Sequence, residues 1–164
     1  WRPGFAFIER TIGTIYGFRR SLCVFSHIYR GTPDRPGLVL GLDAGGSCHG
    51  VGFRVAPGAW QDTLGYLRQR EQVTAVYREV EVPVRLAAQG RQVRALTYAA
   101  DRRHPQYAGR QSIPDLLRLI RQGTGISGSC AEYVLNTVEH LRELGIHDAE
   151  LETLVSRLKD ETGS

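Results

Sequence analysis

The most informative pattern of apolar and polar positions lies in residues 59–77, "AWQDTLGYLRQREQVTAVY". Trp60, Leu64 and Leu67 are spaced by four and then three residues, which places them on one face of a helix. The next position of this stripe is Glu71, a carboxylate where an apolar residue would continue the core-facing side. The β-branched and aromatic residues of "VTAVY" predict a strand directly afterwards. We therefore expect Glu71 at the junction between a helix and a strand.

Strands are predicted on both sides of this helix, which itself is expected to begin near Pro57. Residues 10–29 are rich in β-branched and aromatic side chains. In residues 37–55, "GLVLGLD" and "CHGVGFRV" flank "AGGS", which predicts a glycine-turned hairpin. Residues 76–86 and 92–100 alternate apolar and polar positions around "AAQGRQ" and predict a second hairpin.

The second half of the chain predicts helices. Ser112 and Asp115 form a capping pair ahead of "LLRLIRQG", and Ser129 with Glu132 forms an S-x-x-E capping box ahead of "CAEYVLNTVEHLRELG". A last helix is predicted from apolar positions at helical spacing: Leu151, Leu154, Val155 and Leu158. Strands first and helices later favour one α+β domain, with its sheet curled into a barrel.

Composition narrows the class of protein. The chain has 164 residues, of which 41% are hydrophobic and 23% charged, as in globular domains. No apolar run approaches the ~20 residues of a membrane span, and no signal peptide is evident. Cys23, Cys48 and Cys130 are odd in number and include no CxxC pair. This pattern argues against a disulfide framework or a metal site and predicts a cytoplasmic protein without a membrane partner.

The net charge of +4 and the pI near 9.2 raise the question of nucleic-acid binding. The densest basic pairs, Arg19–Arg20 and Arg102–Arg103, do not extend into a stripe, and no RNP-like or helix-turn-helix pattern accompanies them. We expect a solvated, mildly basic surface and no nucleic-acid partner. A small anionic substrate is compatible with the same charge.

Two interpretations of Glu71 stay open from periodicity alone. A carboxylate that loses hydration ionises less readily, and one at the edge of a cleft can take up and return a proton. Alternatively, the helix ends by residue 70 and Glu71 points into water. We expect Arg68 and Arg70 on other faces of the helix, so neither is an obvious buried partner from spacing alone.

Two other kinds of site are less well supported. Cys48 and His49 invite a thiol-hydrolase interpretation, but adjacent residues of a strand point to opposite faces and cannot form a nucleophile–base pair. His27 or His104 would have to serve as the base, and nothing selects either. The loop "GTGISGS" resembles a phosphate-binding loop but lacks the lysine that the motif requires.

Several segments together resemble the ChaC-type γ-glutamylcyclotransferases. These are "SHIYRGTPDRPG", "GVGFRV", "RQRE", "RHPQYAGR" and "SGSCAEYVLNTVEHLRELGI", and their order and spacing cover nearly the whole chain. The resemblance implies a single domain over residues 1–164, an α+β fold built on a small mixed β-barrel with flanking helices. It also implies a lyase that releases 5-oxoproline and cysteinylglycine from glutathione, or acts on another γ-glutamyl amide, with no cofactor and no metal.

The resemblance also assigns residues. The family's catalytic glutamate follows an arginine at the end of this helix, which implies that Glu71 is the general acid/base. Tyr133, in an "EYL"-like setting, is implied as a substrate-binding residue, and Tyr77 is a weaker candidate. The alternative for both tyrosines is a core position with the hydroxyl bonded to the backbone.

The chain departs from the family at its start. The family carries a "YGSL" segment that cradles the γ-glutamyl group and is followed by a tryptophan. Trp1 resembles that tryptophan, so we expect the numbered chain to lack the substrate-loop strand. The rival interpretation is therefore a non-catalytic regulatory or small-ligand-binding protein of the same fold, like a cation-transport regulator. A retained, buried Glu71 favours the enzyme, and a solvated Glu71 favours the binder.

Overall fold

The computed structural model describes most of the chain: residues 3–71, 73–88 and 90–160. Trp1, which the family resemblance pairs with the tryptophan behind the substrate loop, lies outside these ranges. The chain divides into two compact units, the first made of residues 1–21 and 41–104, and the second of residues 22–40 and 105–164.

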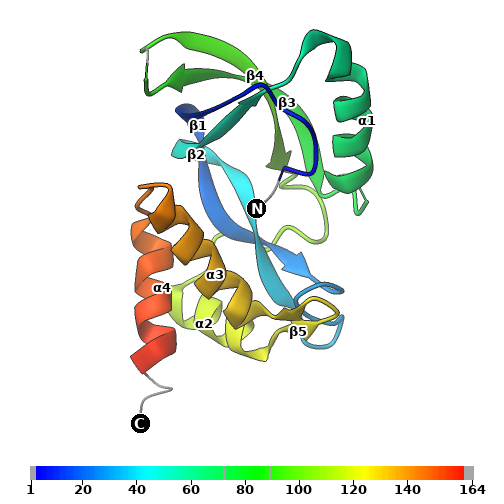
Figure 1. The fold of residues 1–164 in the computed structure, drawn as a ribbon. Helices are drawn as coiled ribbons and strands as arrows, with labels where there is room; N and C mark the ends of the chain where they lie inside the picture. Colours follow the sequence, from blue (N-terminus) through cyan, green and yellow to red (C-terminus); the bar gives the residue numbers. More distant parts are fainter. Residues whose placement is uncertain (1–2, 72, 89, 161–164) are drawn as a thin grey trace. The chain divides into compact units, whose positions relative to one another are not determined.

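Four strands form a closed barrel in the order β1, β2, β4, β3 (Figure 1). Their bounds are Glu9–Ser26 for β1, Gly37–Arg54 for β2, Tyr77–Leu86 for β3 and Gln92–Ala100 for β4. β3 and β4 form an antiparallel hairpin, and β3 also pairs antiparallel with β1. β2 meets β4 in parallel, at Leu42 and Ala99. The structure thus confirms the mixed α+β barrel and the second predicted hairpin.

The core of the barrel follows from the alternation along β3. Val82, Val84 and Leu86 are buried, while Pro83 and Arg85 between them are exposed. Period-two alternation of this kind places one face of a strand against the core. Five partly buried residues of β1, β3 and β4 pack against this apolar face: Ile15, Phe18, Val80, Val93 and Ala95.

The first predicted hairpin is wrong, because β2 runs without interruption through the "AGGS" segment. Gly45 and Gly46 have φ angles of +99° and +75°, which L-residues rarely adopt. A Cβ built on Gly45 would lie 3.3 Å from Nη1 of Arg19, and one on Gly46 would lie 3.5 Å from Cβ of Arg19. The glycines therefore let the strand pass close to the Arg19 side chain instead of reversing its direction.

The sequence predicts a helix that begins near Pro57. The structure has a short 3₁₀ turn there, η1 (Pro57–Ala59), and helix α1 (Trp60–Glu71) follows it directly. It lies on the outside of the barrel beside β3 and β4 (Figure 1). The predicted core-facing stripe is wrong for Trp60, which is 40% exposed, and Leu64 is only half-buried. Thr63 is the buried residue of this helix. A helix at the periphery covers only part of its apolar face.

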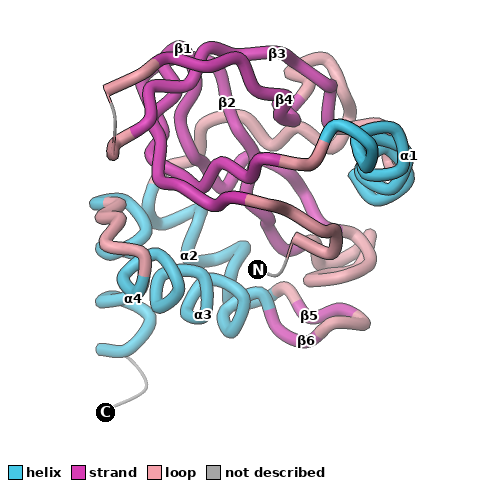
Figure 2. The backbone as a smooth tube through the Cα atoms, turned by 45° about the horizontal axis from the view of Figure 1, so that its top comes forward, coloured by secondary structure: helices cyan, strands magenta, loops and turns pink. Residues whose placement is uncertain are grey.

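Three helices of the second unit pack against one another (Figure 2). They are α2 (Ile113–Gln122), α3 (Cys130–Glu143) and α4 (Ala149–Asp160), and a two-stranded hairpin of β5 (Thr124–Gly125) and β6 (Gly128–Ser129) precedes α3. The hydroxyl of Ser112 accepts the Asp115 N–H at 3.3 Å, and Ser129 and Glu132 form both bonds of a capping box, as predicted. The predicted apolar face of α4 is buried. None of the helices in the described ranges is long and apolar enough to cross a membrane.

Candidate active site

Glu71 is the last residue of α1, and its side chain is 26% exposed. Its Oε1 lies 3.0 Å from Nε of Arg70, a half-exposed side chain that spacing alone does not mark as a buried partner. At a helix end, the long arginine side chain can fold back toward the neighbouring carboxylate. Arg70 Nη1 also donates to the backbone carbonyl of Pro3 at 2.9 Å. Arg70 therefore holds the segment at Pro3 beside the end of α1 and beside Glu71.

The turn after Glu71 has an uncommon backbone. Ala75 has a φ of +56° although it is not glycine, a conformation that the surrounding structure must hold in place. The next residue, Val76, is 1% exposed, and its carbonyl accepts the N–H of Asp101 at 2.8 Å. These contacts fix the point at which the chain leaves α1 and enters β3.

A polar cluster of Arg68, Glu79 and Tyr98 connects α1 with the β3–β4 hairpin. Arg68 grips the Glu79 carboxylate with two bonds, from Nε to Oε2 at 2.9 Å and from Nη2 to Oε1 at 2.8 Å. The Tyr98 hydroxyl donates to Oε2 of Glu79 at 3.3 Å. Glu79 and Tyr98 stand opposite each other in the strand register. Sequence reasoning missed this cluster, because its members are brought together only by strand register and helix placement.

The protonation states in this cluster follow from its contacts. The bond from the Arg68 guanidinium holds the pKa of the Glu79 carboxyl below its usual value. Burial, the charge and hydrogen bond of Glu79 and, more weakly, the charge of Glu71 raise the pKa of Tyr98 to about 12. Tyr98 is therefore a neutral hydroxyl at physiological pH, and the Glu71 carboxylate lies close enough to act on it electrostatically.

The two candidate substrate-binding tyrosines occupy different units. Tyr77 is half-buried at the first position of β3, in the same unit as Glu71. Tyr133 lies in α3 of the second unit, where its hydroxyl accepts the Leu40 N–H at 3.1 Å. The guanidinium carbon of Arg30 lies 5.3 Å from the centre of its ring. Burial raises the pKa of Tyr133 to about 12, so this hydroxyl is also neutral.

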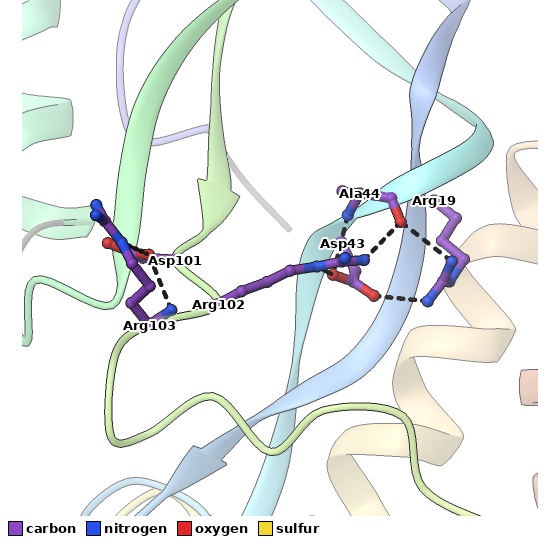
Figure 3. A network of polar contacts seen from close by, with 6 residues as sticks. All are labelled: Arg19, Asp43, Ala44, Asp101, Arg102 and Arg103. Carbon is purple, nitrogen blue, oxygen red and sulfur yellow. Dashed lines mark hydrogen bonds and ion pairs between the residues drawn. The ribbon is translucent and has the colours of Figure 1, made fainter.

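A second polar network is centred on Asp43, whose side chain is 2% exposed (Figure 3). Arg19 Nη2 lies 2.6 Å from its Oδ2, and Arg102 Nε lies 2.8 Å from its Oδ1. Both arginines also donate to the carbonyl of Ala44. Arg103 contacts a different carboxylate: its backbone N–H donates to Oδ1 of Asp101 at 3.0 Å. Arg19 and Arg102 are therefore both matched by an acid, Asp43, while their own side chains stay 38% and 50% exposed.

A cavity of about 680 Å³ lies in the first unit, against the apolar face of β3. Arginines from three strands contribute to its lining: Arg20, Arg54 and Arg94. Glu71 and Tyr77 do not line it. Within residues 3–71, 73–88 and 90–160, no group of three His, Cys, Asp or Glu side chains is placed to hold a metal ion.

Comparison with known proteins gives a consistent result. Residues 1–161 match the family described as ChaC-like protein. The chain is 31% identical to the glutathione-specific γ-glutamylcyclotransferase of Escherichia coli K12 over 159 residues, covering 97% of this chain and 68% of the relative. It is 32% identical to glutathione-specific γ-glutamylcyclotransferase 1 of Danio rerio, covering 87% of this chain and 74% of the relative.

The fold is also similar to a solved structure. The crystal structure of a yeast γ-glutamyl cyclotransferase specific to glutathione superposes with a TM-score of 0.85, covering 98% of this chain and 91% of the yeast chain. The sequence identity between the two is 21%, so this similarity establishes the fold.

Proposed function

Because the chain belongs to the ChaC-like family, we propose that it is a γ-glutamylcyclotransferase that acts on glutathione. The observation that carries this proposal is the match over nearly the whole chain to relatives that bear this enzyme's name. The rival interpretation, a non-catalytic regulator or ligand-binding protein of the same fold, is not favoured by these relatives. The half-buried Glu71 carboxylate, paired with Arg70, also fits an enzyme better than a fully solvated side chain would.

The reaction requires little covalent chemistry from the protein. In a γ-glutamyl amide, the α-amino nitrogen attacks the γ-carbonyl carbon of the same residue and closes a five-membered lactam. The bond from the γ-carbon to the cysteine nitrogen then breaks, giving 5-oxoproline and cysteinylglycine. Since the attack is intramolecular, neither water nor an enzyme nucleophile is consumed. The protein has to hold the substrate folded and to move one proton.

We infer that Glu71 moves this proton. As a carboxylate it accepts the proton that the attacking amine loses, and as a carboxylic acid it returns the proton to the departing nitrogen. Arg70, whose Nε lies 3.0 Å from Oε1 of Glu71, keeps the side chain in one orientation. The neutral hydroxyl of Tyr98 adds a polar neighbour that does not itself carry charge at physiological pH.

Tyr77 and Tyr133 are proposed as substrate contacts. The Tyr133 hydroxyl accepts one backbone N–H and keeps its own proton, which leaves a donor for a substrate carbonyl or carboxylate. Tyr77 begins β3 after the turn that follows Glu71, and it is half-buried. Support for Tyr77 is limited to this position.

We further propose that both units act as one γ-glutamylcyclotransferase-like domain in the cytoplasm. The family match spans both units, and β1 and β2 each contribute residues to both. Cys23, Cys48 and Cys130 form no disulfide, which is typical of a reducing compartment.

The test is incubation of the purified full chain with glutathione, followed by chromatography of the products. We expect equal amounts of 5-oxoproline and cysteinylglycine. Free glutamate in place of 5-oxoproline would indicate hydrolysis and contradict the cyclisation, and the absence of any product would contradict the proposed function. γ-Glutamylalanine as a second substrate tests the preference for glutathione.

A further inference from the structure

We propose that Glu79 is a positioning residue for Glu71, and that it acts through Arg68 and Tyr98. The inference rests on the proposed function, because it assigns a role in that reaction. Glu79 binds two side chains: Arg68, on the helix that ends in Glu71, and Tyr98, whose hydroxyl feels the charge of the Glu71 carboxylate.

The first step of the argument concerns the end of α1. Arg68 and Glu71 are three residues apart in α1, which makes them neighbours one turn apart, so the expectation that Arg68 lies on another face of the helix is wrong. Arg68 is bound by Glu79 through two parallel bonds, the arrangement that restricts a guanidinium most. Glu79 lies within β3, so this ion pair connects the last turn of α1 to a strand of the barrel.

The second step concerns Tyr98. Its hydroxyl donates to the same carboxylate oxygen that Arg68 Nε binds, so Glu79 orients both groups at once. Tyr98 stands directly across from Glu79 on β4, and Glu71 acts electrostatically on its hydroxyl. The charged and titratable groups linked to Glu71 are therefore Arg70 on its own helix and Tyr98 on β4, and Glu79 on β3 in turn binds Tyr98 and Arg68.

A comparable ion pair on the same hairpin shows what distinguishes this one. Glu81, two residues further along β3, pairs with Arg94 at 2.8 Å, but the two side chains are 62% and 74% exposed. Glu79 and Arg68 are 23% and 51% exposed and connect β3 with helix α1, whereas Glu81 and Arg94 connect the two strands of one hairpin. Glu81→Gln is thus a matched control that removes a carboxylate from the same strand without touching α1.

The experiment measures kcat, KM and the pH dependence of kcat/KM for the full chain carrying Glu79→Gln, Arg68→Gln or both. A displaced Glu71 should lower kcat by roughly 3- to 30-fold with KM nearly unchanged, because proton transfer depends steeply on geometry. Glu79→Gln removes a negative charge and leaves Arg68 unneutralised, so the acid limb of the profile should move to lower pH. Arg68→Gln leaves Glu79 unneutralised, so the acid limb should move to higher pH.

The double variant separates position from charge. It has the wild-type net charge, so the acid limb of its pH profile should return close to the wild-type position. Its kcat should stay low, because the Arg68–Glu79 contact that holds α1 is gone. A purely structural ion pair would reduce thermal stability without moving the acid limb in opposite directions. Glu81→Gln should leave both kcat and the profile at wild-type values.

Several results would overturn the inference. They are a Glu79→Gln variant as active as Glu81→Gln, or acid limbs that stay fixed or move in the same direction in the two single variants. If either single variant fails to fold, Tyr98→Phe provides the second test, with kcat expected to fall at unchanged KM, and a normal kcat would reject the role. A wild-type chain that forms no 5-oxoproline overturns the proposed function and this inference together, whereas an active wild type with unaffected variants overturns the inference alone.

Discussion

Arg102, in the loop after β4, places its Nε 2.8 Å from Oδ1 of Asp43, a carboxylate in β2 that is only 2% exposed. Arg19 in β1 binds the other oxygen of the same carboxylate (Figure 3). A single buried side chain thus joins two strands of the barrel and the loop that leaves it.

Replacement of Asp43 by asparagine should destabilise the protein. The variant loses a buried charge that two guanidinium groups satisfy, and an amide can accept only part of those bonds. We expect the free energy of unfolding to fall by about 2–4 kcal/mol, since the two arginines are half-exposed and regain some hydration. Urea denaturation measures this change. Asp34→Asn, at an exposed loop position, is the control and should leave the midpoint unchanged.

Glu71→Gln should abolish most of the turnover without unfolding the protein. The amide keeps the shape and can still accept the Arg70 bond, but it cannot act as a base. We expect kcat to fall roughly 10²- to 10⁴-fold, the usual contribution of a positioned acid–base group, with KM little changed. Steady-state kinetics and a thermal melt on the same sample check both statements. Full activity in this variant would show that Glu71 does not move the proton.

Tyr133→Phe tests a residue with two possible roles. The change removes the acceptor for the Leu40 N–H, which lies at 3.1 Å, and should lower the free energy of unfolding by about 1–2 kcal/mol. If Tyr133 also donates to the substrate, as proposed, KM should rise as well. Comparison of denaturation with kinetics at saturating and limiting glutathione distinguishes the two effects. An unchanged KM would limit Tyr133 to the core.

The contact between α3 and α4 should weaken in acid. Arg142 Nε donates to Oε1 of Glu152 at 2.8 Å, and Nη2 donates to Oε2, which holds the pKa of the Glu152 carboxyl below its usual value. The folded state therefore binds this proton less readily than the unfolded state. The resulting stability is present above the unfolded pKa and is lost as the pH falls through the folded value.

Arg142→Gln should remove the part of the folding stability that the wild-type protein loses in acid. Because the two side chains are 53% and 22% exposed, we expect the Tm at neutral pH to fall by no more than about 2–3 °C and the difference from wild type to shrink below pH 4. Melting curves between pH 3 and 7 measure this. Arg157→Gln, at an exposed position of α4, should show no such convergence, and an Arg142→Gln effect that persists at pH 3 would contradict the linkage.

Short-range chemistry in the sequence by itself determined the elements of this protein. Ser129 and Glu132 predict the start of α3, because the two bonds of a capping box join residues three positions apart. The apolar spacing that predicts α4 involves residues within one or two helical turns. The alternation that predicts the hairpin of residues 76–86 and 92–100 involves a single pair of strands. These signals need no knowledge of distant segments, and the structure confirms them. The same holds for the end of α1 at Glu71, where helix-forming residues give way to β-branched ones.

Only the tertiary structure decided which residues meet. The pair Gly45–Gly46 is a turn signal on its own, yet β2 continues through it and passes close to the Arg19 side chain. Arg102 lies 58 or 59 residues from the groups that it binds, and Arg68 lies 11 residues from Glu79. Whether an arginine is solvated or clamps a buried carboxylate depends on strand register and barrel closure, which are set by packing of the whole unit and leave no periodic trace along the chain.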